Sequence, residues 1–97
     1  MLFKRKKPER VAKHGFIEGR VQSVAFRFYT RQEATQLQLS GWVQNLADGR
    51  VEFHVQGAVG SVKEFLDWAR IGPPLAVVRD LTVHAAELEP HDLFEIR

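Results

Sequence analysis

The sequence predicts one small α+β domain in which two helices cover one face of an antiparallel sheet. Three observations predict it: a length of 97 residues, which fits a single core, two stretches with helical apolar spacing, and several short stretches typical of strands. Hydrophobic residues make up 44% of the chain and charged residues 27%, the balance of a globular domain. The chain has no cysteine, which excludes disulfides, thiol catalysis and cysteine-based metal centres.

Strand, loop and helix patterns follow one another in the first 41 residues. Residues 12–18 predict a strand, and the small, polar residues 19–25 predict a loop. A helix is expected from Phe26, because the side chains that follow share one helical face: Phe26, Tyr29, Thr30, Ala34 and Leu37. Ser40-Gly41 is expected to end this helix, with Gly41 in the left-handed conformation.

Two strands joined by a tight turn are expected next. Residues 42–46 predict a short strand, and Asp48-Gly49 tolerates the positive φ that a hairpin turn requires. Residues 50–56 alternate between two faces. Val51, Phe53 and Val55 are expected to face the helices, which leaves on the open face of the sheet Arg50, Glu52, His54 and Gln56.

The last third of the chain repeats the helix and strand pattern. Val62, Phe65, Leu66 and Ala69 have the spacing of a second amphipathic helix, which Gly72-Pro73-Pro74 ends. Residues 81–86 predict a strand, 89–92 a turn and 93–96 a last short strand. The order β-α-β-β-α-β with a short C-terminal strand is the split βαβ arrangement of a ferredoxin-like α/β sandwich.

The basic charge is concentrated at the start of the sequence. Residues 1–10 hold five basic side chains and one acidic one, a net charge of +4 in a chain of +2, so residues 11–97 carry −2. We therefore expect residues 1–10 to form a basic, disordered tail and residues 11–97 to form the folded domain. A mildly acidic domain does not favour nucleic acid as a partner.

No stretch of the sequence has the ~20 apolar residues that a membrane helix needs. The basic stretch is followed by polar residues instead of the apolar segment of a secretory signal. We therefore expect a cytoplasmic protein with no membrane partner.

The loop before the first helix is the first candidate site. Small residues that lead into a helix present free backbone N–H groups at the positive end of the helix dipole, where anions such as phosphate bind. Arg27 stands at the helix start, and its guanidinium can hold a phosphoryl group through two parallel hydrogen bonds. By pattern alone this signal is weak, and a solvated arginine beside an ordinary loop is the favoured interpretation. The loop consists of Gly19, Arg20, Val21, Gln22, Ser23, Val24, Ala25 and Phe26.

Asn45 is the second candidate. Asparagine is depleted in strands, yet Asn45 lies in an apolar strand beside Trp42 and Val43. Its amide offers both a donor and an acceptor and could hold a water molecule in one orientation. An asparagine that bonds its own backbone near a turn is the alternative.

These segments together resemble the acylphosphatase family from about residue 12 to residue 97. The shared motifs occur in order: Gly19-Arg20-Val21-Gln22-x-Val24-x-Phe26-Arg27, Ala34, Gly41-Trp42-Val43-x-Asn45, Asp48-Gly49-x-Val51-Glu52, Val55-Gln56-Gly57, Gly72-Pro73-Pro74-x-Ala76-x-Val78 and Phe94-x-Ile96. Each motif is weak by itself, whereas the ordered set is specific.

The resemblance implies a ferredoxin-like sandwich and metal-independent hydrolysis of the carboxyl–phosphate bond of acyl phosphates. It implies that Arg27 is the phosphate-binding catalytic arginine, that Asn45 positions the attacking water, and that the loop Gly19–Phe26 is the phosphate cradle. It implies no metal and no cofactor. The expected partners are a small acyl phosphate as substrate and inorganic phosphate as product and competitive ligand, and the chain is expected to be a monomer.

Ser23 departs from the family pattern, which usually has glycine there. If the position is left-handed, serine costs about 1–2 kcal/mol more than glycine. The serine hydroxyl could also reach the phosphate. Ala25 stands at a second position where glycine is common, although the family tolerates other residues there.

The sequence also leaves two alternative functions open. An RNA-binding module can share this topology, although the predicted open face lacks a pair of aromatic side chains on adjacent central strands. A catalytically weak acylphosphatase-like protein could use the cradle only to bind a small anion. The histidines (His14, His54, His84 and His91) show no spacing typical of a metal site.

Overall fold

The computed structural model describes residues 9–97. Residues 1–8, most of the expected basic tail, lie outside this range. The elements are β1 (Arg10–Arg20), α1 (Phe26–Gln36), β2 (Ser40–Asn45), β3 (Val51–Ala58), α2 (Val59–Ala69), β4 (Val77–Ala86) and β5 (Phe94–Ile96). Arg10 already belongs to β1, where it pairs with Ala58. Among the described residues, no helix is long and apolar enough to cross a bilayer.

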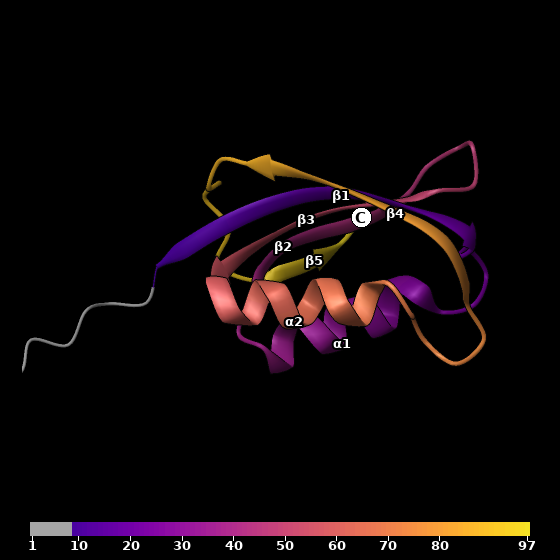
Figure 1. Cartoon of the computed structure of the whole chain (residues 1–97), viewed down its shortest axis with the longest axis horizontal. Helices are drawn as coiled ribbons and strands as arrows, with labels where there is room; N and C mark the ends of the chain where they lie inside the picture. Colours follow the sequence, from indigo (N-terminus) through magenta and orange to yellow (C-terminus); the bar gives the residue numbers. More distant parts are fainter. Residues whose placement is uncertain (1–8) are drawn as a thin grey trace, which may run out of the picture.

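The five strands form one sheet in the order β4-β1-β3-β2-β5, and both helices lie on the same side of it (Figure 1). β1, β2, β3 and β4 pair antiparallel, as expected. The expectation of an entirely antiparallel sheet is wrong for β5, which pairs parallel to β2. The connection from β4 crosses the sheet to the far edge, where β5 pairs with β2. Both β2 and β5 run opposite to β4, so they are parallel to each other.

The core lies between the sheet and the helices. Val51, Phe53 and Val55 of β3 are fully buried there, which confirms the predicted alternation. The ring of Phe53 packs edge-on against Phe65 of α2, with 5.3 Å between ring centroids, and α1 contributes Phe26. The two helices thus bury the predicted apolar faces, apart from Tyr29, which is exposed.

The end of α1 differs from the prediction. The left-handed residue is Gln38, with φ 58°, and Gly41 already lies inside β2. Gly41 serves close packing of the backbone instead, because a Cβ atom there would lie 1.9 Å from the carbonyl oxygen of His54. A glycine that fits between strands has the same local sequence signal as one that ends a helix.

The face of the sheet opposite the helices is less open than predicted. His54 and Gln56 are buried there, at 3% and 2% exposure, because residues 87–93 cross over β3 on their way to β5. Gln56 makes two hydrogen bonds to the main chain of Glu89. The alternation therefore predicted the correct face of the sheet for these side chains, but the prediction that they are open to solvent is wrong.

Candidate functional site

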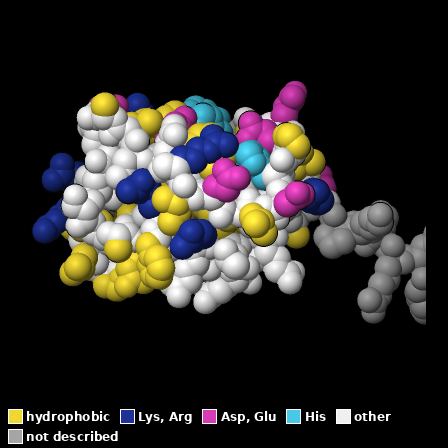
Figure 2. Space-filling view, turned by 180° about the vertical axis from the view of Figure 1, so that it is seen from behind, with side chains coloured by type: hydrophobic (Ala, Val, Ile, Leu, Met, Phe, Trp, Pro, Cys, Tyr) yellow, Lys and Arg dark blue, Asp and Glu magenta, His cyan; other side chains and the backbone are white. Residues whose placement is uncertain are grey.

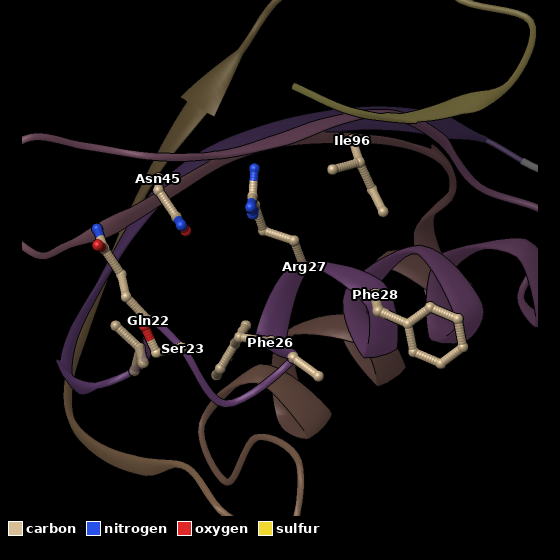
Figure 3. Close-up of a pocket in the computed structure, with 9 residues that line it drawn as sticks. Gln22, Ser23, Phe26, Arg27, Phe28, Asn45 and Ile96 are labelled. Atoms are coloured by element: carbon tan, nitrogen blue, oxygen red, sulfur yellow. The ribbon is translucent and has the colours of Figure 1, made fainter.

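A pocket of about 230 Å³ lies where the loop after β1, the start of α1, the end of β2 and β5 meet (Figure 3). Residues from both predicted motifs line it, although they are far apart in the sequence. Its walls are Val21, Gln22, Ser23, Ala25, Phe26, Arg27, Phe28, Asn45 and Ile96.

The loop is held in an unusual backbone conformation. Ser23 and Ala25 both have left-handed backbone angles, with φ 60° and φ 58°. Gln22 fastens the loop to the β2–β3 hairpin, since its side-chain Nε2 donates to the carbonyl oxygens of Leu46, at 2.8 Å, and Arg50, at 3.0 Å. The loop is thus shaped by its attachment to the hairpin, and the left-handed residues turn the chain sharply into α1.

The first turn of α1 lacks the usual compensation of its dipole. Ala25 is the N-cap residue and makes no side-chain capping hydrogen bond within the described part of the chain, and the first turn holds no acidic side chain. The orphan N–H groups and the positive end of the dipole therefore remain available to an anion in the pocket.

Arg27 projects from the start of α1 toward the sheet (Figure 3). Its Nη1 donates a hydrogen bond to the main-chain oxygen of Arg97, at 2.8 Å. Arg97 is itself fixed, because its N–H donates to the carbonyl oxygen of Val43, at 2.8 Å. One edge of the guanidinium is thus anchored, and its other N–H groups can face the pocket.

Asn45 is the last residue of β2 and pairs with Val51. It lies on the same side of the sheet as Val43, two residues earlier, and therefore on the side of the helices. Asn45 remains exposed at this end of the sheet, and its amide points toward the guanidinium of Arg27 in Figure 3. The two residues singled out from the sequence thus share one pocket.

Comparison with known proteins identifies this arrangement. The acylphosphatase family model matches residues 13–96. The chain belongs to the acylphosphatase family. An acylphosphatase of Trichormus variabilis is 49% identical over 84 residues, which is 87% of this chain and 83% of that protein.

Solved structures agree with the family assignment. An acylphosphatase structure from Coxiella burnetii superposes with a TM-score of 0.88 at 35% identity, covering 91% of this chain and 93% of that one. The acylphosphatase of Bacillus subtilis gives 0.87 at 35% identity, covering 90% and 98%. The expectations of an acylphosphatase, hence of a hydrolase, and of a ferredoxin-like α+β fold are confirmed.

The pocket of this acylphosphatase-family chain does not include every predicted loop residue. Gly19 and Arg20 still belong to β1, where they pair with Val78 and Val77 of β4, and Val24 is buried in the core. These three residues support the loop and do not line the pocket. Of the predicted cradle Gly19–Phe26, the residues that line the pocket are Val21, Gln22, Ser23, Ala25 and Phe26.

Phe28 and Ile96 line the pocket, although sequence reasoning did not place them there. Phe28 is 51% exposed, and the only signal in the sequence was an aromatic residue off the apolar face of α1. Ile96 comes from β5, whose position beside β2 could not be read from periodicity. Together they give the polar pocket an apolar border.

The aromatic side chains on the opposite face of the sheet do not form an open stacking platform. Phe16 of β1 and Trp42 of β2 lie there with β3 between them. The guanidinium of Arg50 lies 4.6 Å from the Phe16 ring centroid, and that of Arg97 lies 4.6 Å from the Trp42 centroid. Arginine side chains of the same chain thus lie over both rings, where an RNA base would have to stack. This does not favour the RNA-binding alternative.

Proposed function

We propose that the pocket binds the phosphoryl group of a small acyl phosphate and hydrolyses its bond to the carboxyl group. Main-chain N–H groups at residues 23–27 and the guanidinium of Arg27 bind the phosphoryl oxygens and stabilise the charge of the transition state. The observation that carries this proposal is the position of Arg27, fixed by the Arg97 main-chain oxygen beside a helix start with no compensating acid.

Asn45 orients the attacking water in this proposal. The water oxygen forms a bond to phosphorus while the bond between phosphorus and the bridging oxygen breaks. The electron pair of the broken bond leaves with the carboxylate, and the protons of the water remain on the inorganic phosphate. A carboxylate is a good leaving group, so positioning and electrostatic stabilisation suffice without a general acid.

The organic part of the substrate lies against the apolar border formed by Phe28 and Ile96. Phe28 is half exposed and the pocket is open to solvent on this side, so the acyl group is not enclosed. This favours small acyl groups with little selection among them, and it makes benzoyl phosphate a suitable probe.

The test is hydrolysis of benzoyl phosphate by the full chain and by Arg27→Ala and Asn45→Ala. We expect Arg27→Ala to lose phosphate binding and almost all turnover, on the order of 10²–10³-fold or more in kcat. Asn45→Ala should lose turnover and keep phosphate binding. Arg31→Ala, an exposed arginine one turn further along α1, is the matched control and should hydrolyse like the parent.

Parent-like hydrolysis by both Arg27→Ala and Asn45→Ala would refute the assignment of these residues. Phosphate binding by the parent without turnover would favour the second candidate, an anion-binding protein on the acylphosphatase fold. Ser23 is the residue that motivates this candidate. It has a left-handed backbone angle and carries a hydroxymethyl side chain at a position where the family usually has glycine. Unchanged turnover in Ser23→Gly would mean that the serine neither assists nor impairs the loop.

We further propose that the protein acts as a monomer in the cytoplasm and that inorganic phosphate competes with the substrate. A pocket formed by elements of one chain supports the monomer, and the absence of cysteine from the sequence supports the cytoplasm. Light scattering during size-exclusion chromatography tests the oligomeric state. A phosphate-dependent rise in KM at constant kcat tests the competition.

A further inference from the structure

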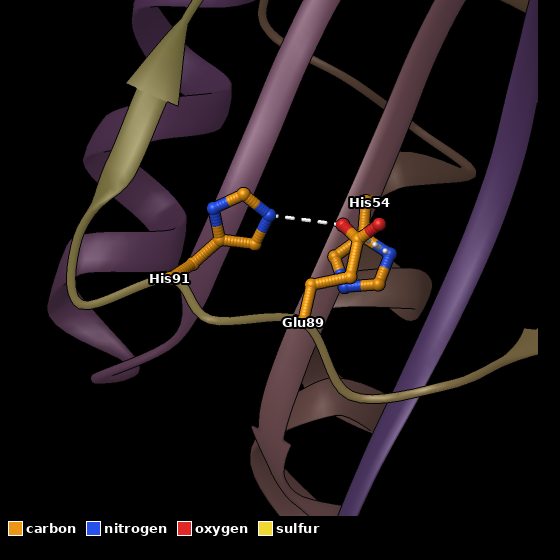
Figure 4. Close-up of side chains that lie close together, drawn as sticks. All are labelled: His54, Glu89 and His91. Carbon is orange, nitrogen blue, oxygen red and sulfur yellow. Dashed lines mark hydrogen bonds and ion pairs between the residues drawn. The ribbon is translucent and has the colours of Figure 1, made fainter.

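A cluster of two histidines and a glutamate lies on the face of the sheet opposite the pocket. His54 comes from β3, and Glu89 and His91 come from the segment that crosses β3 between β4 and β5 (Figure 4). One potential ligand atom of each side chain lies within 4.8 Å of the others. No local pattern indicates this cluster, because the crossing that assembles it brings together residues far apart in the sequence.

The distances from Glu89 to the two histidines are close to those between ligands in a metal coordination sphere. His91 Nε2 lies 2.9 Å from Glu89 Oε1, and His54 Nδ1 lies 3.5 Å from the same oxygen. Ligands bound tetrahedrally to zinc at about 2.0–2.1 Å are themselves about 3.3 Å apart. Small side-chain rotations would therefore place all three atoms around one ion.

Gln56 fixes which nitrogen of His54 can serve as ligand. The side-chain Nε2 of Gln56 donates to the carbonyl oxygen of Glu89, at 2.7 Å, and its Oε1 accepts from the Glu89 N–H, at 2.8 Å. These two bonds orient the amide, so the atom that lies 2.8 Å from His54 Nε2 is an acceptor oxygen. His54 must donate from Nε2, and in the neutral ring Nδ1 carries the lone pair.

That lone pair faces Glu89 Oε1, at 3.5 Å. A neutral His54 would direct an acceptor toward a carboxylate, which when ionised is also only an acceptor. A protonated His54 would direct its N–H at an oxygen 3.5 Å away, beyond the usual 2.7–3.2 Å of an N–H···O bond. A cation between the two atoms would satisfy both.

We propose that His54 Nδ1, Glu89 Oε1 and His91 Nε2 bind a Zn²⁺ ion, with water in the fourth position. Two histidines and one glutamate form a known zinc ligand set, and the hydrogen bond from His54 Nε2 to Gln56 is the outer-shell contact that such a ligand usually makes. On binding, Zn²⁺ takes the place of the Nε2 proton that His91 shares with Glu89. The bound His91 is a neutral imidazole that carries its proton on Nδ1.

The site is accessible from one side and closed on the other. Trp42 stacks over His54, with 6.4 Å between ring centroids and 18° between ring planes, and closes the side toward β2. The side chains of Glu89 and His91 are 46% and 15% exposed, so an ion can enter from solvent. Figure 2 shows histidine (cyan) and acidic (magenta) side chains next to each other at the surface.

The ion would take no part in the reaction at the pocket, because the sheet separates the two sites. It would hold the crossing segment, residues 87–93, against β3, and the same segment leads directly into β5. We therefore expect Zn²⁺ to raise Tm of the folded chain.

Isothermal titration of ZnCl2 into the full chain, in a buffer that does not bind metals, tests the proposal. We expect one ion per chain, and at least tenfold weaker binding by Glu89→Gln and by His91→Ala. His84→Ala is the matched control, because His84 is an exposed histidine of β4 on the same face of the sheet, and it should bind like the parent. Thermal unfolding gives a second readout: Zn²⁺ should raise Tm of the parent and of His84→Ala only.

Several results would overturn the proposal. They are no binding by the parent at millimolar Zn²⁺, equal binding by the parent, Glu89→Gln and His91→Ala, or an equal loss in His84→Ala. Glu89→Gln keeps the main-chain bonds to Gln56, and its circular dichroism shows whether the fold is intact. Because the test measures metal affinity, its failure leaves the assignments of Arg27 and Asn45 unaffected.

Discussion

Ala25 provides a direct measure of the backbone strain stored in the loop. Its φ of 58° and ψ of 27° lie in the left-handed region, which costs an L-residue about 1–2 kcal/mol. Ala25→Gly removes this cost and adds about 0.5–1 kcal/mol of backbone entropy to the unfolded chain. The expected net result is a stabilisation of about 0.5–1 kcal/mol.

The matched control is Ala47→Gly in the β2–β3 turn. Ala47 is also exposed, but it is not among the described residues with positive φ. The same chemical change there carries only the entropy cost and should destabilise by about 0.4–1 kcal/mol. The entropy cancels between the two variants, so the difference between them isolates the left-handed strain of about 1–2 kcal/mol.

Urea unfolding at equal m-value measures both free energies, and thermal unfolding provides a check. For a chain of this size, about 1 kcal/mol shifts Tm by roughly 4–8 °C, so the two variants should differ by at least several degrees. If Ala25→Gly destabilised the chain as much as Ala47→Gly, the loop would not be strained at Ala25.

Three further predictions concern the frame around the pocket. Gln22→Ala removes both hydrogen bonds from the loop to the hairpin. It should lower the unfolding free energy by about 1–3 kcal/mol and reduce kcat for benzoyl phosphate. Unchanged values in urea unfolding and turnover would contradict this. Gly41→Ala should prevent stable folding, since the new Cβ meets backbone, whereas Gly60→Ala in α2 meets nothing within 4 Å and should raise Tm, both followed by circular dichroism. Hydrogen bonds from the Arg50 main-chain N–H and guanidinium lower the pKa of Asp48, so its contribution to stability is present above the unfolded pKa and is lost as pH falls through the folded one. Asp48→Asn should therefore flatten the fall in unfolding free energy as the pH drops below the usual pKa of aspartate, and an unaltered pH profile would speak against it.

Local patterns were sufficient to predict most of the fold, whereas the roles predicted for Arg27 and Asn45 came from the resemblance to the acylphosphatase family. The alternation of Val51, Phe53 and Val55 identified the inner face of β3, because period-two burial leaves a direct trace in the sequence. By local pattern Arg27 and Asn45 were only candidates, because each is a polar residue at a position where its element favours another type. The structure then placed both at one pocket.

Features created by distant segments could not be predicted in this way. His54 is buried only because residues 87–93 lie over it, and Ile96 lines the pocket only because β5 pairs with β2. The left-handed residue after α1 is Gln38, although glycine at position 41 has the stronger local preference for that conformation. In each case a contact made elsewhere in the chain decided the outcome.

The strand order leaves β4 at one border of the sheet, where within residues 9–97 one row of its backbone N–H and C=O groups has no partner strand. Such a row is a template on which a second copy of the chain could add a strand and begin a fibre. β5, at the other border, has three residues and offers little length for this. Arg79 and Asp80, both exposed on β4, place charge along the longer template, so valine at both positions would favour aggregation without disturbing the pocket.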